Sequence, residues 1–99
     1  MEDAQRERLA SYLATLLSRI EREKRYPRAA RRRGIQGKVD SRFELDCKGR
    51  ISGLRLRSKE KMLRGATRRA IEAARPLPAP PPGVPCPMPV HFVMEFLLR

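Results

Sequence analysis

The side chains with the most reactive chemistry in this sequence are two cysteines and one histidine, Cys47, Cys86 and His91. Two thiols and one imidazole make a poor ligand set for a structural zinc ion. A catalytic nucleophile needs a base within hydrogen-bond reach, and no such pairing is recognisable in the sequence. The acidic residues are mostly interspersed among arginines on faces that we expect to be exposed. The sequence therefore predicts no catalytic site, no metal site and no cofactor, and we do not expect an enzyme.

Positive charge is the second chemical signal. The chain has 23 Lys and Arg residues against 11 Asp and Glu, which gives a formal net charge of +12. A balance this basic favours association with a polyanion or an acidic partner but does not specify a fold. The densest segment, KRYPRAARRRGIQGKV, spans residues 24–39. A nucleic-acid-binding domain is one interpretation, although two Tyr and three Phe provide few stacking platforms for bases.

The first part of the chain has a helical pattern. Apolar residues recur at three- and four-residue spacing between residues 2 and 25, which indicates an amphipathic helix. The Tyr26-Pro27 pair ends this helix, because the residue before a proline avoids the helical conformation. Pro27 suits the first position of a short second helix, which we expect Gly34 to end.

Two strands follow, joined by a tight turn. Apolar and polar residues alternate over residues 38–46, which indicates a half-buried strand. The turn CKGR contains Gly49, which can adopt a positive φ. In the next strand Ile51 and Leu54 have opposite parity, so we expect a β-bulge near Gly53.

A third helix and a third strand complete the domain. We expect Ser58 to cap the helix and Pro76 to mark its end. The proline-rich segment PLPAPPPGVPCPMP favours an extended conformation. In the final segment, VHFVMEFLLR, alternate positions form one apolar face: Val90, Phe92, Met94, Phe96 and Leu98.

This order of elements predicts an α+β fold. We expect a three-stranded antiparallel sheet with strand order 2-1-3, helices packed on one face, and a β-β-α-β core preceded by the N-terminal helix, with a right-handed crossover. Antiparallel pairing of the first and third strands would bring Cys47 close to Cys86. A disulfide and two unpaired, buried cysteines both remain open at this point, because the choice depends on the cellular compartment.

Three segments together resemble the C-terminal domain of TonB energy-transducing proteins. They are KRYPRAARRRGIQGKVDSRFELDCKGRISGLRLRS, LRGATRRAIEAARPLP and PVHFVMEFLLR, and the similarity covers roughly residues 21–99. The shared features are Tyr-Pro, Gly-Ile-x-Gly-x-Val, Asp-x-x-Gly-Arg, a Leu/Ala helix, a proline-rich connector and a final apolar strand. The chain differs from many members at Ser58-Lys59-Glu60 and at Arg64.

The resemblance implies a periplasmic domain. Residues 26–99 would form the TonB C-terminal-like domain, with residues 1–25 as an N-terminal amphipathic helix of the same domain. The parent protein would be anchored in the inner membrane and would meet motor proteins there through a preceding segment. The domain would bind the TonB box, a short peptide of an outer-membrane transporter, during uptake of iron-siderophore, haem or similar cargo. An oxidising periplasm also favours a Cys47–Cys86 disulfide.

The third strand is the expected docking site. A long apolar edge strand invites aggregation unless a partner uses it, and an added peptide strand supplies main-chain hydrogen bonds. The alternative is that this strand only fills the core or is covered by a second copy. The transporter-binding residues predicted in this strand are Val90, His91, Phe92, Val93, Met94, Glu95 and Phe96. The resemblance adds the residues around Tyr-Pro: Glu23, Lys24, Arg25, Tyr26 and Pro27.

Other partners and functions remain open. A TolA-like envelope-maintenance domain would have a similar fold, although Tyr-Pro and Gly-Ile-x-Gly favour the TonB family. The cell wall peptidoglycan is a further candidate partner of the basic surface, and the TonB interpretation involves no nucleic acid. A strand-exchanged homodimer is a known hazard for a small sheet with open edges.

Overall fold

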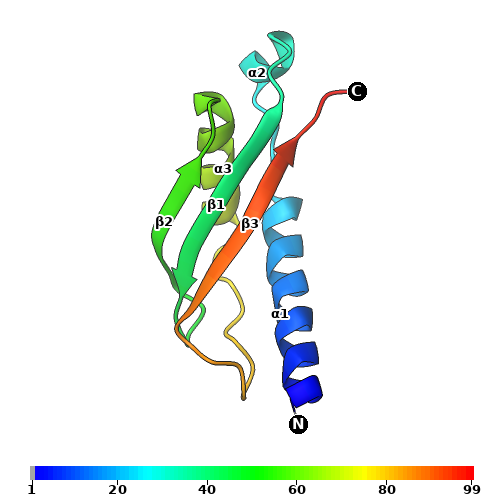
Figure 1. The fold of residues 1–99 in the computed structure, drawn as a ribbon. Helices are drawn as coiled ribbons and strands as arrows, with labels where there is room; N and C mark the ends of the chain where they lie inside the picture. Colours follow the sequence, from blue (N-terminus) through cyan, green and yellow to red (C-terminus); the bar gives the residue numbers. More distant parts are fainter. Residues whose placement is uncertain (1) are drawn as a thin grey trace.

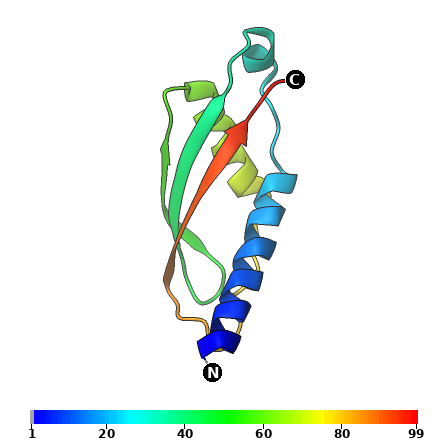
Figure 2. The ribbon, with the colours of Figure 1, turned by 45° about the vertical axis from the view of Figure 1, so that its right-hand side comes forward.

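The computed structural model describes residues 2–99. Its elements are, in chain order, α1 (Glu2–Arg22), α2 (Arg28–Arg32), β1 (Gly37–Leu45), β2 (Ile51–Arg57), α3 (Lys61–Ala73) and β3 (Met88–Phe96). The strands form one antiparallel sheet in the order β2-β1-β3, with α1 and α3 on one side of it (Figure 1 and Figure 2). This arrangement confirms the predicted α+β fold.

The core lies between the sheet and the two longer helices. Alternate residues of β1 and β3 point toward the helices, as the period of two requires. Small residues on the buried face of α3 let its backbone approach the sheet closely. The core residues are Val39, Phe43 and Leu45 in β1, Val90, Met94 and Phe96 in β3, Leu63, Ala66, Ala70 and Ile71 in α3, and Tyr12, Leu16 and Ile20 in α1.

The predicted β-bulge lies in β2. Arg42 of β1 pairs with Arg55, whereas Glu44 pairs with Ser52, so β2 carries one extra residue between these pairs. Gly53 adopts a φ of 63° there, a conformation that glycine tolerates better than other residues. The bulge allows Ile51 and Leu54, which have opposite parity in β2, both to pack against the core.

Three local boundaries differ from the prediction. Helix α1 ends at Arg22 rather than near residue 25, because the chain turns there and carries Lys24 to β3. Pro27 precedes α2 in an extended conformation instead of occupying its first position. The N-cap of α3 is Glu60; the Ser58 hydroxyl accepts the Glu60 N–H at 3.1 Å in a turn before the helix. The predicted division of the chain into an N-terminal helix up to residue 25 and a domain from residue 26 stays a prediction. Met1 lies outside the described residues.

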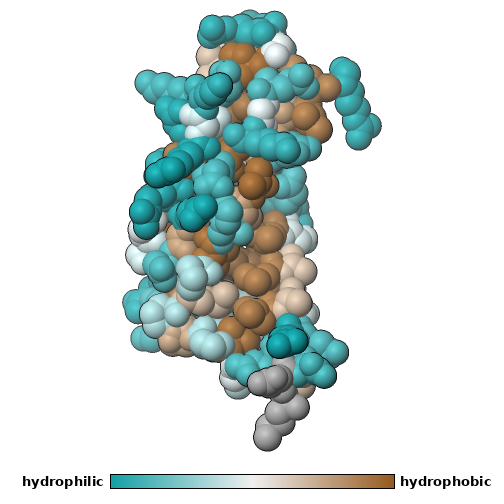
Figure 3. Space-filling model, in the orientation of Figure 1, coloured by the Kyte–Doolittle hydropathy of each residue, from teal (hydrophilic) through white to brown (hydrophobic). Residues whose placement is uncertain are grey.

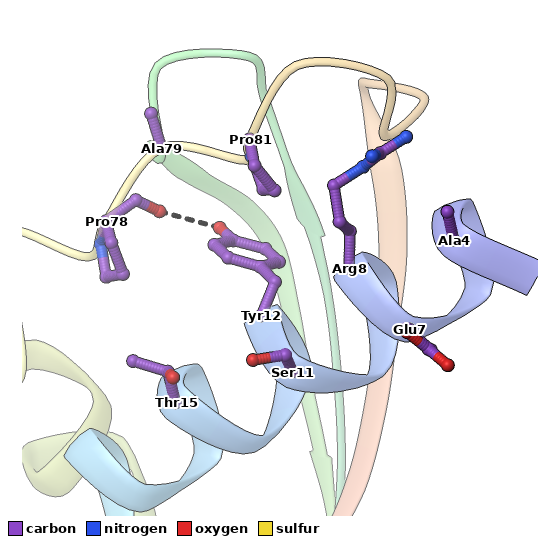
Figure 4. Close-up of a pocket in the computed structure, with 9 residues that line it drawn as sticks. All are labelled: Ala4, Glu7, Arg8, Ser11, Tyr12, Thr15, Pro78, Ala79 and Pro81. Atoms are coloured by element: carbon purple, nitrogen blue, oxygen red, sulfur yellow. Dashed lines mark hydrogen bonds between the residues drawn. The ribbon is translucent and has the colours of Figure 1, made fainter.

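Side chains of α1 hold the proline-rich connector that leads to β3. Gln5, Tyr12 and Arg19 are spaced about two helical turns apart, so they lie along one line of the helix. Figure 4 shows the Tyr12 hydroxyl bonded to the connector. Proline has no N–H but keeps its carbonyl acceptor, so a helix that presents donors suits this segment. The acceptors are the carbonyls of Gly83 (2.6 Å), Pro78 (2.6 Å) and Pro76 (3.1 Å).

A disulfide joins Cys47 to Cys86, with 5.2 Å between their Cα atoms. The bond continues the β1–β3 register, because Leu45 pairs with Met88, Cys47 stands two residues after Leu45, and Cys86 stands two residues before Met88. It closes a sequence separation of 39 residues that includes β2, α3 and the connector. The cross-link therefore limits how far the two paired strands can separate in the unfolded chain.

Breaking this disulfide is expected to destabilise the domain. The loss of loop closure predicts a decrease of about 2–4 kcal/mol in the free energy of unfolding. Denaturant titrations with and without reductant measure it. The double variant Cys47→Ser/Cys86→Ser is the control. Its midpoint should match that of the reduced protein and should not change when reductant is added. Equal midpoints for oxidised and reduced protein would contradict the prediction.

The β1–β2 turn is organised by one carboxylate. Asp46 accepts hydrogen bonds from the Lys48 N–H at 2.8 Å, the Arg50 N–H at 2.9 Å and the Arg50 Nε at 2.7 Å. These bonds, with those from Arg50 the strongest, lower the pKa of Asp46 from 3.8 to about 2. Gly49, at a φ of 84°, lies so close to the Leu77 carbonyl that an added Cβ would stand 2.5 Å from it.

The charge on Asp46 predicts a specific pH dependence. Because the folded-state pKa is lowered from 3.8 to about 2, its stabilising effect is complete above pH 3.8 and is lost toward pH 2. Asp46→Asn should therefore lower the thermal midpoint at neutral pH, and its difference from the native protein should disappear near pH 2. Glu44→Gln, at the neighbouring exposed carboxylate, is the control. A difference that stays constant across this range would refute the assignment.

Candidate functional site

The free edge of β3 is the first feature that could bind a partner. In a strand, the N–H and C=O of one residue point to the same side, and successive residues alternate. Pro89 lies within β3 and has no N–H to give to β1, so the main-chain groups of Pro89 belong to the set that points away from β1. The Glu95 carbonyl also points away from β1, because it accepts a hydrogen bond from Lys24 Nζ, at 2.8 Å, outside the sheet. The two residues between them with the same parity are His91 and Val93.

The free edge is therefore short and has defined ends. His91 and Val93 direct both main-chain groups away from β1, whereas Phe92 and Met94 direct theirs toward it. Pro89 limits the donors at one end. At the other end, Lys24 already occupies an acceptor.

An apolar strip accompanies this edge. Figure 3 shows hydrophobic atoms along the border between β3 and α1, with hydrophilic side chains over β1 and β2. Val93 is 50% exposed and lies on the open face of the sheet, with His91 and Glu95. Phe92 of β3 and Leu9 and Leu13 of α1 are half-buried and pack against the core. A strand added to β3 would thus meet apolar surface as well as main-chain groups.

The segment around Tyr26-Pro27 packs against the end of β3. Lys24 Nζ lies 5.5 Å from the centre of the Phe96 ring and 2.6 Å from Glu21 Oε1. The Tyr26 ring meets the Phe96 ring edge-on, with 5.5 Å between centroids. The Tyr26 hydroxyl donates to the Ile35 carbonyl. The structure thus brings together two groups of residues that are far apart in sequence, both of which we predicted to bind the transporter.

The other predicted site residues differ in accessibility. Arg25 is exposed, and Glu23 and Pro27 are half-buried beside Tyr26. His91 and Glu95 are exposed on the open face of the sheet. Three of the predicted site residues in β3 are buried in the core: Val90, Met94 and Phe96.

An ion-pair cluster lies on the open face beside the free edge. Asp40 Oδ1 accepts a hydrogen bond from His91 Nε2 at 2.5 Å, and Asp40 Oδ2 accepts one from Arg42 Nε at 3.2 Å. The bond from His91, followed by that from Arg42, holds the pKa of Asp40 below its usual value of 3.8. We did not predict Asp40 or Arg42 as site residues. Predicting this cluster requires the strand register, which pairs Arg42 with both His91 and Arg55 and could not be read from the sequence pattern.

A separate hollow of about 550 Å³ lies between α1 and the connector (Figure 4). No residue of β3 lines it, and the Tyr12 hydroxyl beside it is already bonded to Pro78.

Within residues 2–99, no group of His, Cys, Asp and Glu side chains is suited to hold a metal ion. None of the helices described here has the length and apolar character needed to cross a membrane.

Comparison with known proteins identifies the family. The fold is similar to the NMR solution structure of the Helicobacter pylori TonB C-terminal domain, with a TM-score of 0.75 and 23% sequence identity over 90% of this chain and 82% of that one. No curated protein sequence matches the chain. The family described as Gram-negative bacterial TonB protein C-terminal matches residues 22–98. The chain therefore belongs to the family of Gram-negative bacterial TonB C-terminal domains.

Proposed function

We propose that this chain binds the TonB box of outer-membrane transporters by accepting the peptide as a fourth strand beside β3. The observation that carries this proposal is the free edge at His91 and Val93, bounded by Pro89 and by the bond from Lys24 to Glu95. Family membership supports it, because TonB C-terminal domains are periplasmic interaction domains of energy transducers.

The geometry suits a reversible, moderately selective contact. His91 and Val93 offer two N–H and two C=O groups, and each main-chain bond contributes about 1 kcal/mol net. Such bonds alone give weak binding with little sequence preference. Phe92 and Leu13, on the helical side of the edge, add selectivity, since they favour a peptide with apolar side chains at the alternate positions that face α1. Val93 offers a separate apolar contact on the open face.

The residues around Tyr26 would extend this contact. Arg25 is exposed where the free edge ends, and Tyr26 and Lys24 fix that segment on Phe96. A transporter segment that continues past the docked strand would meet Arg25 next. Glu23 and Pro27 hold the backbone of this turn and contribute part of its surface.

The same row of bonds can transmit force. When a docked strand is pulled along its own axis, its main-chain bonds are loaded together rather than in sequence. In the full-length protein we expect an N-terminal inner-membrane anchor, coupled to motor proteins that use the proton-motive force. The cargo would be an iron-siderophore, haem or a similar nutrient.

Proline at Val93 tests the docking edge. Val93→Pro should leave the β1–β3 ladder intact, because the lost N–H points outward, and should weaken binding of a TonB-box peptide at least about tenfold. Val93→Thr is the matched control, since it keeps a branched side chain and the N–H. NMR titration measures both. Unchanged affinity of the proline variant would reject this edge, and no saturable binding by the native chain would favour a TolA-like role.

Amide hydrogen exchange gives an independent test of the strand parity. In the free protein, the amides of His91 and Val93 should exchange quickly, whereas those of Phe92 and Met94 should be protected by β1. Saturating TonB-box peptide should slow exchange at His91 and Val93 only. Protection of all four amides in the free chain would show that the edge is already covered, as in a dimer.

A further inference from the structure

One end of the molecule concentrates positive charge that peptide docking does not use. Between residues 24 and 38 the chain has seven Lys and Arg and no Asp or Glu. Arg28, Arg31, Arg32 and Arg33 are all exposed on α2 and its C-terminal turn. In the described chain, the salt bridges of this segment involve Lys24 and Lys38 but none of these four arginines. Arg31 instead lies over the Tyr26 ring, 5.3 Å from its centre.

An exposed apolar side chain lies at the same end. Leu97 has 64% of its surface exposed, more than Val93. Its position is held from both sides, because Phe96 pairs with Gly37 and the Leu98 N–H donates to Gln36 Oε1 at 2.6 Å. Figure 1 shows α2 and the C-terminus close together at this end. A large exposed apolar residue thus lies at the same end of the molecule as the four arginines.

We propose that this basic end, formed by Arg28, Arg31, Arg32, Arg33 and Leu97, binds an anionic phospholipid surface. Cations around an exposed apolar residue are typical of proteins that lie on membranes, where the apolar group enters the headgroup boundary. This activity goes beyond peptide docking and does not depend on it.

The form of the basic end favours a membrane over a folded acidic protein. The arginines extend from a helix of five residues at one tip of an elongated molecule, 50 × 25 × 20 Å in extent. Three of the four, Arg28, Arg32 and Arg33, form no hydrogen bond, ion pair or ring contact through their side chains within the described residues. Lipid headgroups can move laterally to meet such exposed charges, whereas a folded partner presents carboxylates at fixed positions.

The size of the effect can be anticipated. Each Lys or Arg close to an anionic surface strengthens binding about fivefold. The attraction decays over about 8 Å at physiological salt, so only cations that face the surface contribute fully. Two arginines of the basic end should therefore matter far more than two arginines on another face.

Sedimentation with phospholipid vesicles tests the proposal. The native chain should bind vesicles of phosphatidylglycerol and phosphatidylcholine, and should not bind vesicles of phosphatidylcholine alone. Arg32→Gln/Arg33→Gln should weaken binding about 25-fold. The matched control is Arg68→Gln/Arg69→Gln, which removes the same charge from the exposed face of α3 and should change binding less than about twofold. Equal losses in both variants would overturn the proposal, because attraction by net charge alone would explain them.

Leu97→Ser tests the apolar part at constant charge. It should weaken vesicle binding about fivefold, since a leucine inserted into the headgroup boundary loses most of its apolar area. Circular dichroism checks that each variant is folded. Titration with a TonB-box peptide without vesicles should give native affinity for Arg32→Gln/Arg33→Gln, which separates this site from the docking edge. Binding to polyglutamate but not to anionic vesicles would overturn the membrane assignment in favour of an acidic protein partner.

Discussion

The antiparallel pairing of β1 with β3 is the constraint on which the other features depend. It places the buried residues of both strands on the helical face, and it directs the main-chain groups of His91 and Val93 outward. A slip of one residue would turn Val90 and Met94 to the open face. The Cys47–Cys86 bond lies at the next matching positions of the register, so a slipped pairing would also separate the two sulfur atoms.

Local patterns were sufficient to predict the strands, the turn and the bulge at Gly53, because each depends on residues close in sequence. The sheet order followed from the sequence of elements and the right-handed crossover rule. The contacts of the site could not be predicted in this way. The Asp40–His91 bond requires the β1–β3 register, and the Lys24–Glu95 bond requires the position of α1 beside the sheet. Taking Cys47 and Cys86 as opposed residues would have given that register from the sequence.

The net charge of +12 has different physical roles in different places. On the open face of the sheet, Asp40 bonds both His91 and Arg42, and Lys38 lies 3.8 Å from Glu95. In the β1–β2 turn, Arg50 is used to hold Asp46. The segment around α2 contains no acidic residues, and its four exposed arginines form no salt bridge in the described residues. Sequence composition alone could not show this difference, because the ion pairs elsewhere depend on the fold.

The line of donors on α1 has a mechanical consequence. Gln5, Tyr12 and Arg19 attach the helix to the connector at three levels along its axis. A pull along that axis would load these attachments in shear, whereas a sideways pull would peel them off in turn. The disulfide at Cys86 joins the connector to Cys47 after β1, so tension that crosses these hydrogen bonds would reach both paired strands. The proline-rich segment would thus pass a load from the helix to the sheet.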